Sequence, residues 1–219
     1  MIIRRTILLL VLPLLFIVLN GCSENVPSSR GVYMLIDTSG TYTKEIEQAQ
    51  RVINYILSDL NSGDSFAVAS VDTASFSEKD IKYKIHFDDR PTRANQQKRL
   101  FREKINEFVK NVKPSAYTDI TGGMLQAIEW LNESRSGHNT IIIFSDLKED
   151  LKKGYVRDIP FQLDGYQVVA LNVTKLRTDN VDPREYMDRL ANWQERVESG
   201  GGKWQVINDL DRIDSILKN

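Results

Sequence analysis

Apolar residues are arranged along the chain in two alternating patterns. Short runs almost free of charged residues are followed by longer segments in which apolar residues recur every three or four positions. A short apolar run is typical of a strand buried on both faces, as in a parallel sheet covered by helices. Such runs predict strands at Gly31–Ile36, Phe66–Val71, Thr140–Asp146, Gln167–Val173 and Trp204–Ile207.

The segments between these runs have the spacing of amphipathic helices. Predicted helices cover 43–60, 91–112, 124–131 and 182–197, and a last helix begins at Asn208. Residues 81–87 differ, because apolar and polar residues alternate there as in a strand with one face in water. We therefore predict an α/β fold with a doubly wound, mostly parallel central sheet, one antiparallel edge strand and helices on both faces.

The first residues have the layout of an export signal. Met1–Arg5 is short and basic, and Thr6–Leu19 is almost wholly apolar but short for a membrane span. The end of this segment, Leu19-Asn20-Gly21-Cys22, resembles the lipobox of bacterial lipoproteins. The resemblance implies that residues 1–21 are a signal peptide and that Cys22, the only cysteine, carries lipid such as palmitate.

The resemblance also implies an address in the cell envelope. Ser23 is not the aspartate that holds enterobacterial lipoproteins in the inner membrane, so the periplasmic side of the outer membrane is favoured over the inner membrane. Residues 22–30 form a linker that reaches on the order of 25 Å when extended. The predicted domain, 31–219, therefore lies close to the bilayer, and its first strand points the loop after Asp37 away from the membrane.

Oxygen-bearing side chains gather in three predicted loops. Asp37, Ser39 and Thr41 alternate directly after the first strand, Thr118 follows the second helix, and Asp146 ends a later strand. The carboxyl ends of strands line the ligand crevice of an open α/β sheet. Carboxylates and hydroxyls are the ligands that hard cations such as Mg²⁺ prefer, so the first loop is a plausible half of a metal site. Each loop by itself is equally typical of residues that turn the chain and cap a helix.

The three loops together resemble a known arrangement. Asp37-Thr38-Ser39-Gly40-Thr41, Thr118-Asp119-Ile120-Thr121 and Ser145-Asp146 are similar, in order, spacing and context, to the metal-ion-dependent adhesion site (MIDAS) of the von Willebrand factor A domain. Residues 200–210 are similar to the closing strand and helix of that family. The resemblance covers roughly residues 31–217.

The resemblance implies a metal-binding role for five residues. Asp37, Ser39, Thr41 and Thr118 would hold the metal directly or through water, and Asp146 would complete the protein's share of the ligands. One position would remain for a carboxylate from a partner protein. The charges of two carboxylates balance a divalent cation, and the resulting site still accepts an acidic side chain. A third carboxylate from the protein would repel that side chain. Mg²⁺ is the expected ion, with Mn²⁺ next.

Three positions depart from the family pattern or leave it open. Thr41 stands where serine is commoner, although its hydroxyl is kept. Leu147 stands where the family usually has glycine, so we expect a stiffer backbone after Asp146. In the second loop, Thr121 remains an alternative to Thr118 as the metal ligand, because spacing alone does not separate the two.

Composition narrows the possible functions. The chain has 219 residues, of which 41% are hydrophobic and 27% charged, as expected for one globular domain. With 29 Lys and Arg against 30 Asp and Glu, the net charge of −1 gives no basic surface for nucleic acid. The sequence also lacks a serine-nucleophile elbow, a His-Glu-x-x-His motif and a phosphate loop.

Two alternative functions remain. An aspartate after the first strand and Asp146 with Asp150 after a later one also resemble magnesium phosphatases of the haloacid dehalogenase-like family. Those enzymes need an acid two residues after the nucleophile, where this chain has Ser39. The second alternative is a metal-independent scaffold in the envelope. We predict instead a metal-dependent adhesion or assembly domain that is not an enzyme and binds another protein.

Overall fold

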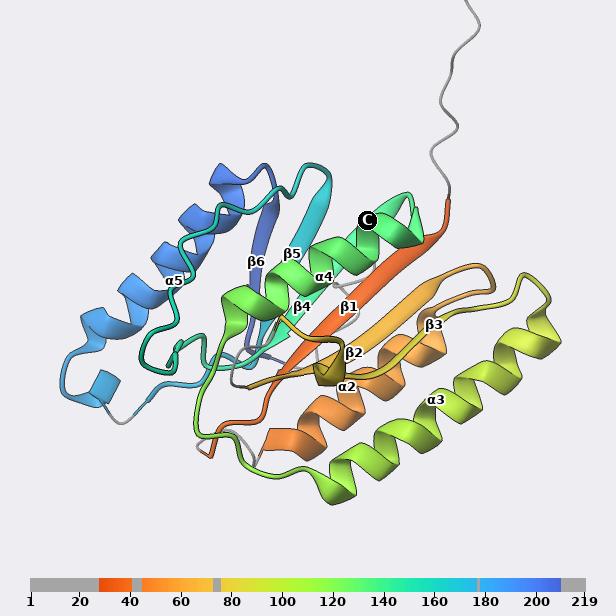
Figure 1. Ribbon diagram of the computed structural model, residues 1–219, viewed down its shortest axis with the longest axis horizontal. Coiled ribbons are helices and arrows are strands. Elements are labelled where there is room, and N and C mark those ends of the chain that lie inside the picture. The colour runs from red at the N-terminus through yellow and green to blue at the C-terminus, as the bar shows by residue number, and fades with distance from the viewer. Residues whose placement is uncertain (1–27, 41–44, 73–75, 177, 210–219) are drawn as a thin grey trace, which may run out of the picture.

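The computed structural model of the chain describes residues 28–40, 45–72, 76–176 and 178–209, and Figure 1 shows its ribbon. Six strands form one sheet in the order β3-β2-β1-β4-β5-β6. The strands are β1 (Arg30–Asp37), β2 (Ser65–Val71), β3 (Ile81–His86), β4 (His138–Phe144), β5 (Tyr166–Leu171) and β6 (Lys203–Ile207). The helices are α2 (Ile46–Asp59), α3 (Pro91–Asn111), α4 (Ile120–Ser134) and α5 (Pro183–Ser199), with short 3-10 turns η2 (Glu78–Asp80) and η3 (Thr178–Asn180).

The predicted sheet topology is confirmed. Every neighbouring pair of strands is parallel except β2 and β3, so β3 is the antiparallel edge strand. Strand β4 ends at Phe144, two residues before the predicted end, because Ser145 and Asp146 leave the sheet for the following loop. The predicted signal peptide and Cys22 lie outside the described residues, as does most of the helix predicted from Asn208.

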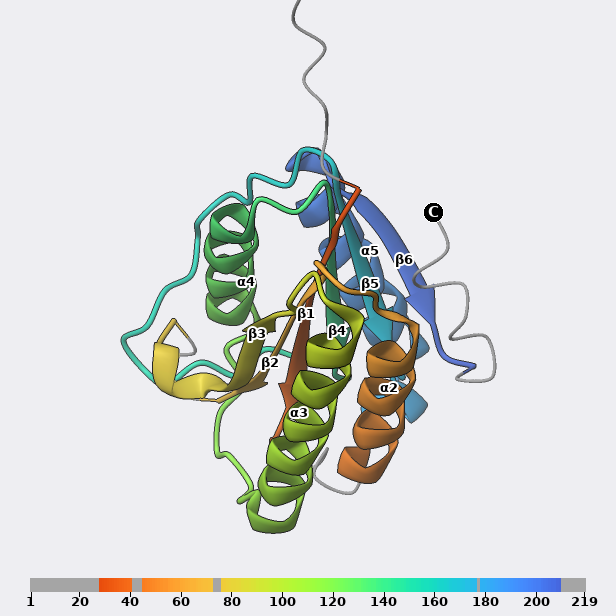
Figure 2. The same cartoon turned by 90° about the vertical axis from the view of Figure 1, so that its right-hand side faces the viewer.

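Helices cover both faces of the sheet. In β1, the alternate residues Val32 and Met34 pack against α2 and α3, whereas Tyr33 and Leu35 pack against α4 and α5. Figure 2 shows α4 on one side of the sheet and α2 and α3 on the other. Strand β1 is buried from its second residue because it lies at the centre of both cores. Within the described residues, no helix is long and apolar enough to cross a membrane.

The connection from β4 to β5 contains no helix. Residues 145–165 instead run past α4 towards the start of β5 (Figure 1). The later part of this connection is fixed by Phe161 and Leu163, which are buried in the core beneath α4 and α5. The earlier part remains at the carboxyl edge of the sheet, where all the parallel strands end.

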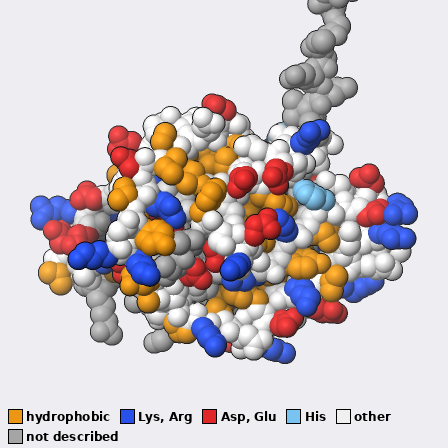
Figure 3. All heavy atoms as spheres, viewed as in Figure 1, with side chains coloured by type: hydrophobic (Ala, Val, Ile, Leu, Met, Phe, Trp, Pro, Cys, Tyr) orange, Lys and Arg blue, Asp and Glu red, His pale blue; other side chains and the backbone are white. Residues whose placement is uncertain are grey.

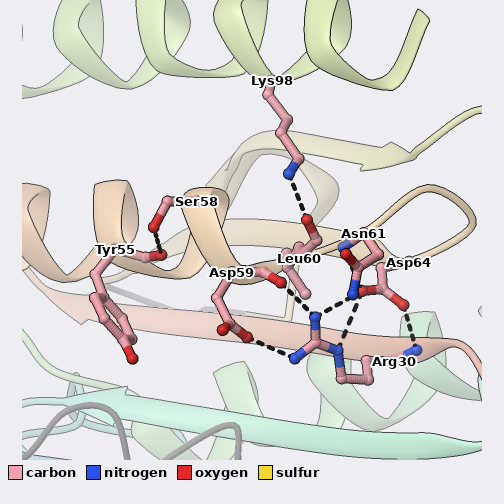
Figure 4. Close-up of polar contacts among 8 residues, drawn as sticks. All are labelled: Arg30, Tyr55, Ser58, Asp59, Leu60, Asn61, Asp64 and Lys98. Carbon is pink, nitrogen blue, oxygen red and sulfur yellow. Dashed lines mark hydrogen bonds and ion pairs between the residues drawn. The ribbon is translucent and has the colours of Figure 1, made fainter. Parts of the chain in front are cut away.

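The opposite edge of the sheet is fastened by the first residue of β1. Arg30 donates to the Asp64 carboxylate from its backbone N–H at 2.8 Å and from its guanidinium at 3.0 and 3.1 Å. The backbone N–H of Asn61 donates to the same carboxylate at 2.7 Å. Arg30 also pairs with Asp59, and Lys98 donates to the backbone oxygen of Leu60 (Figure 4). This network fixes the point at which the chain enters the sheet.

We expect Asp64→Ala to lower the free energy of unfolding by about 2–3 kcal/mol, because it leaves a half-buried guanidinium and two backbone donors without their acceptor. Asp59→Ala removes the more exposed partner of the same arginine, and we expect a loss of less than about 1 kcal/mol. Urea unfolding of the two variants beside the wild type measures both. Equal losses would contradict the central role given to Asp64.

Candidate metal centre

The two predicted metal-binding aspartates lie at the ends of neighbouring strands: Asp37 is the last residue of β1, and Asp146 comes two residues after β4. In the register of β1 and β4, Ile36 lies opposite Phe144, so the next residues, Asp37 and Ser145, are adjacent at the carboxyl edge. The hydroxyl of Ser145 donates to Asp37 Oδ2 at 2.8 Å. Asp37 is only 1% exposed. The first and third loops are thus joined by a buried hydrogen bond.

The first loop turns back on its own aspartate. The backbone N–H of Ser39 donates to Asp37 Oδ1 at 2.8 Å, which holds Ser39 beside the carboxylate. Burial raises the pKa of Asp37, while hydrogen bonds from Ser39 and Ser145 act in the opposite direction. The predicted ligand Thr41 lies outside the described residues.

The second loop is tied to each of the other two. The backbone N–H of Ser115 donates to the backbone oxygen of Thr38 at 2.7 Å. Thr118 and Asp150 exchange two backbone hydrogen bonds, at 2.9 and 3.0 Å. Because each loop is bonded to the other two, the structure brings Asp37, Ser39, Thr118 and Asp146 to one edge of the sheet.

Asp146 is the second buried carboxylate of this edge. It is 4% exposed and accepts a hydrogen bond from the backbone N–H of Lys148 at 2.8 Å. Burial is the main cause that raises the pKa of Asp146, and the negative charge of Asp37 adds to it. The charge of Asp37 therefore makes it harder for Asp146 to be charged.

The donor set fits a hard divalent cation. Two buried carboxylates lie close together, and neither forms an ion pair with a lysine or arginine among the described residues. A cation between them would remove the repulsion, and the hydroxyls of Ser39 and Thr118 would be available as neutral oxygen ligands. In the described part of the chain, no cluster of three or more His, Cys, Asp or Glu side chains is arranged to hold a metal ion.

The two candidate threonines of the second loop have different surroundings. Thr121 is fully buried, and its hydroxyl accepts a hydrogen bond from Arg196 at 2.7 Å. The backbone N–H of Thr121 donates to Glu149 at 2.7 Å. Thr118 pairs with Asp150 through its backbone, and its hydroxyl has no hydrogen bond among the described residues. Thr118 is therefore better placed than Thr121 to offer a hydroxyl to a cation.

Leu147 has the left-handed backbone conformation for which glycine is best suited. Its φ is 65°, which costs a residue with a side chain roughly 1–2 kcal/mol. Three contacts hold it there: its side chain is buried, its N–H donates to Ser145 Oγ at 3.0 Å, and its backbone oxygen accepts from Trp193 Nε1 at 3.0 Å. The substitution of leucine for glycine thus leaves the turn after Asp146 in place but makes it depend on its neighbours.

Helix α5 supports the third loop through residues that the sequence analysis did not single out. Arg189 donates to the backbone oxygen of Asp146 at 2.8 Å, Trp193 to that of Leu147, and Arg196 to the carboxylate of Glu149 at 3.3 Å. Arg189 also pairs with buried Asp179 at 2.9 Å. The spacing of the three donors, at i, i+4 and i+7, places them on one helical face. That spacing is the only sign of this role in the sequence.

Asp119 also holds the second loop in place through hydrogen bonds. This buried carboxylate accepts from the N–H of Gly122 at 2.8 Å and from Arg157 at 2.9–3.2 Å. Gly122 has to be glycine because an added Cβ would lie 2.6 Å from an oxygen of Asp119. Arg157 belongs to the β4–β5 connection, so this segment is bonded to the start of α4.

Comparison with solved structures identifies the fold. A von Willebrand factor type A protein from Catenulispora acidiphila matches 86% of this chain with a TM-score of 0.52 and 15% identity, over 41% of its own length. The pilus adhesin SpaC from Lactobacillus rhamnosus GG matches 88% of this chain with a TM-score of 0.52 and 11% identity, over 29% of its length. The chain thus spans less than half of either protein. Neither a protein-family model nor a curated protein sequence matches it.

These matches show that the chain has the von Willebrand factor A fold, as its three loops predict. Identities of 15% and below establish the fold alone. The roles of individual residues therefore rest on the geometry of this chain.

We expect Trp193→Phe to loosen the loop that carries Asp146, because it removes the hydrogen bond that holds the strained Leu147. The loss of this bond should cost about 1–2 kcal/mol beyond the lost packing. Hydrogen exchange of residues 145–150 should accelerate in this variant. Trp130→Phe removes a similarly buried indole from α4 and serves as the control. Equal exchange in both variants would show that Trp193 contributes packing only.

A second pair of aspartates at the carboxyl edge of the sheet, Asp72 and Asp80, predicts that the stability of the fold depends on pH. Burial and the negative charge of Asp72 raise the pKa of Asp80 to about 6, although Lys82 opposes the shift. The folded chain keeps this proton between pH values of about 4 and 6, where the unfolded chain has released it. The contribution of Asp80 to the free energy of unfolding therefore falls as the pH rises through that range. Above that range, the folded state carries the full cost of the buried charge.

We expect Asp80→Asn to raise the free energy of unfolding by roughly 1–2 kcal/mol near neutral pH, after allowance for screening by solvent. The difference from wild type should vanish at a pH of about 4, where the carboxyl group is protonated in the folded state. Asp72→Asn should reduce the same pH dependence. Thermal unfolding across this range measures all three proteins, and a gain for Asp80→Asn that is independent of pH would contradict the explanation.

Proposed function

We propose that this chain is a metal-dependent protein-binding domain of the bacterial cell envelope, used for adhesion or assembly rather than catalysis. The observation that carries the proposal is the pair of buried carboxylates, Asp37 and Asp146, without an ion pair among the described residues. They lie at the carboxyl edge of a von Willebrand factor A fold, where parallel strands place ligand sites.

The proposed ligands are Asp37, Ser39, Thr118 and Asp146, together with Thr41. Mg²⁺ or Mn²⁺ bound there would supply a positive centre that accepts a carboxylate oxygen. The two aspartates balance its charge, so an acidic side chain from a partner approaches a nearly neutral site. Ser145 and Ser39 orient the Asp37 carboxylate through hydrogen bonds, and α5 fixes the loop of Asp146. The residues are thus largely arranged before a partner arrives.

Protein binding is supported by the fold and by one neighbour. SpaC, which has the same fold, is described as a pilus adhesin. The expected partner offers an aspartate or glutamate to the metal. With 29 basic against 30 acidic residues, the chain has no overall excess of positive charge that would favour nucleic acid as the partner.

The proposed anchor is lipid on Cys22, at the periplasmic side of the outer membrane. Strand β1 begins at Arg30 and ends at Asp37, so the chain enters the sheet at the edge opposite the candidate metal centre (Figure 1). A lipid anchor a few residues before Arg30 would leave the metal centre facing away from the bilayer. A partner in the envelope could then reach it.

The phosphatase alternative gains no supporting observation. Ser39 lies two residues after Asp37 and donates its backbone N–H to that carboxylate, whereas a phosphatase of that family needs an acid there. A measurement of metal binding distinguishes our proposal from the metal-independent scaffold.

The decisive measurement is calorimetric titration of Mg²⁺ and of Mn²⁺ into the wild type and Asp37→Asn. We expect saturable binding by the wild type, and binding at least about tenfold weaker in the variant, because one of two carboxylate ligands is lost. Bound metal should also raise the melting temperature of the wild type alone. Without metal, the variant should be at least as stable as the wild type, because a buried charge and its repulsion with Asp146 are removed.

Asp64→Asn is the matched control, because it removes a buried aspartate from the opposite edge of the sheet. It should lose stability and still bind metal. Failure of the wild type to bind either ion, with or without an acidic peptide present, would favour the scaffold.

A further inference from the structure

A short segment of the β4–β5 connection, beside the candidate metal centre, is bonded at both ends to the second loop. Asp150 exchanges backbone hydrogen bonds with Thr118, and Arg157 forms an ion pair with Asp119 at 2.9 Å. Thr118 and Asp119 are consecutive, and their Cα atoms lie about 3.8 Å apart. The six residues between the two anchors, Leu151–Val156, therefore form a closed loop, and residues 152–156 are exposed. We call this segment the rim loop.

The rim loop has a defined internal turn. The N–H of Tyr155 donates to the backbone oxygen of Lys152 at 3.0 Å, and Gly154 has a φ of 97°, which favours glycine. With its two anchors, this turn gives the loop a shape that does not depend on packing against the core. A partner that binds the metal centre would meet a loop that is already formed.

The exposed side chains of the rim loop are of two kinds. Lys152, Lys153, Tyr155 and Val156 all face solvent, and Val156 is 77% exposed. Neither lysine forms an ion pair among the described residues. Figure 3 shows hydrophobic and basic side chains side by side on the face between α4 and α5. Exposed apolar side chains that the core does not need are typical of an interaction surface.

The charges around the metal centre indicate what such a surface would bind. Two aspartates and a divalent cation are together nearly neutral, so they attract one carboxylate through coordination and not through net charge. Lys152 and Lys153, together with exposed Lys148 next to Asp146, add positive charge at one side of the site. The nearby acidic residue Glu149 is already paired with Arg196, and Asp150 lies at the base of the loop. Within the rim loop itself, Lys152 and Lys153 are the only charged residues, and their positive charge favours a negatively charged partner segment there.

We infer that the rim loop selects the partner of this domain: it binds an acidic peptide segment whose first carboxylate reaches the metal and whose second acidic side chain contacts Lys152 and Lys153. Tyr155 and Val156 contact an apolar side chain of the same segment. This inference rests on the proposed function, because the first carboxylate needs the metal. It adds that one acidic residue is insufficient for strong binding.

The test is selection of random displayed peptides on the full-length protein in the presence of Mg²⁺. We expect the selected peptides to carry two acidic residues and an apolar residue. Their affinity should fall about tenfold in the Lys152→Glu, Lys153→Glu double variant, in which attraction becomes repulsion. The control is Arg93→Glu with Lys203→Glu, which changes the net charge equally at exposed positions on the opposite edge. It should bind the peptides as the wild type does.

The outcomes separate this inference from the proposed function. Loss of Mg²⁺ binding in Asp37→Asn tests the function, and both charge variants should bind Mg²⁺ normally. If Mg²⁺ binds but peptides with one acidic residue bind equally well, or no peptide is selected, the inference is wrong. It is also wrong if the double Glu variant keeps the peptides. If vesicles of anionic lipid bind through Lys152 and Lys153 while no acidic peptide does, the rim loop is a lipid-binding surface instead.

Discussion

The candidate site depends on a carboxylate buried at the end of the central strand. Asp37 ends β1, which lies between β2 and β4, and water has almost no access to it. A charged group in this position costs several kcal/mol unless other charges or hydrogen bonds compensate. The described residues supply only neutral donors, from Ser39 and Ser145. These donors orient the carboxylate but do not balance its charge, which under the proposed function a bound cation would balance.

Hydrogen bonds from uncharged groups also hold the three loops together. Ser145 joins the third loop to the first, the Ser115 N–H joins the second to the first, and Thr118 with Asp150 joins the second to the third. None of these bonds involves a metal. The arrangement therefore does not have to form when an ion arrives, and the binding free energy is not spent on ordering the loops.

The sequence predicts the parts of this molecule that depend on periodic patterns. Uncharged runs such as Gly31–Ile36 have to be buried on both faces, which specifies a sheet between two layers of helices, and Asp37 at the end of such a run has to lie at the carboxyl edge. The support from α5 could not be predicted in the same way. Arg189 and Trp193 act on backbone oxygens, and any residue of the third loop presents a backbone oxygen. No side-chain pattern in the third loop therefore predicts its contact with α5.

Leu147 shows a second limit of the sequence. Leucine in place of glycine predicts a stiffer backbone, but the structure keeps the left-handed turn and supports it with Trp193. A local preference was overridden by a contact from a helix 46 residues away in the chain. The rim loop could not be predicted from the sequence for a related reason, because its shape follows from where its two anchors lie in the fold. Thr41 and Cys22 stay predictions, since both are outside the described residues.

The position of β1 has a mechanical consequence under the proposed function. A partner held at the metal centre pulls on the Asp37 end of β1, and a lipid anchor pulls on the Arg30 end. The load then runs along the strand, which is paired over seven residues with β2 and over seven with β4. Because the third loop shares the metal centre and follows β4, part of the load would pass from β1 to β4. Sliding these two strands past each other would require many of their hydrogen bonds to break together, whereas peeling an edge strand such as β3 breaks them one after another. The Arg30–Asp64 network adds resistance where the anchor would pull. An adhesion domain tethered through its central strand is thus loaded in its strongest direction.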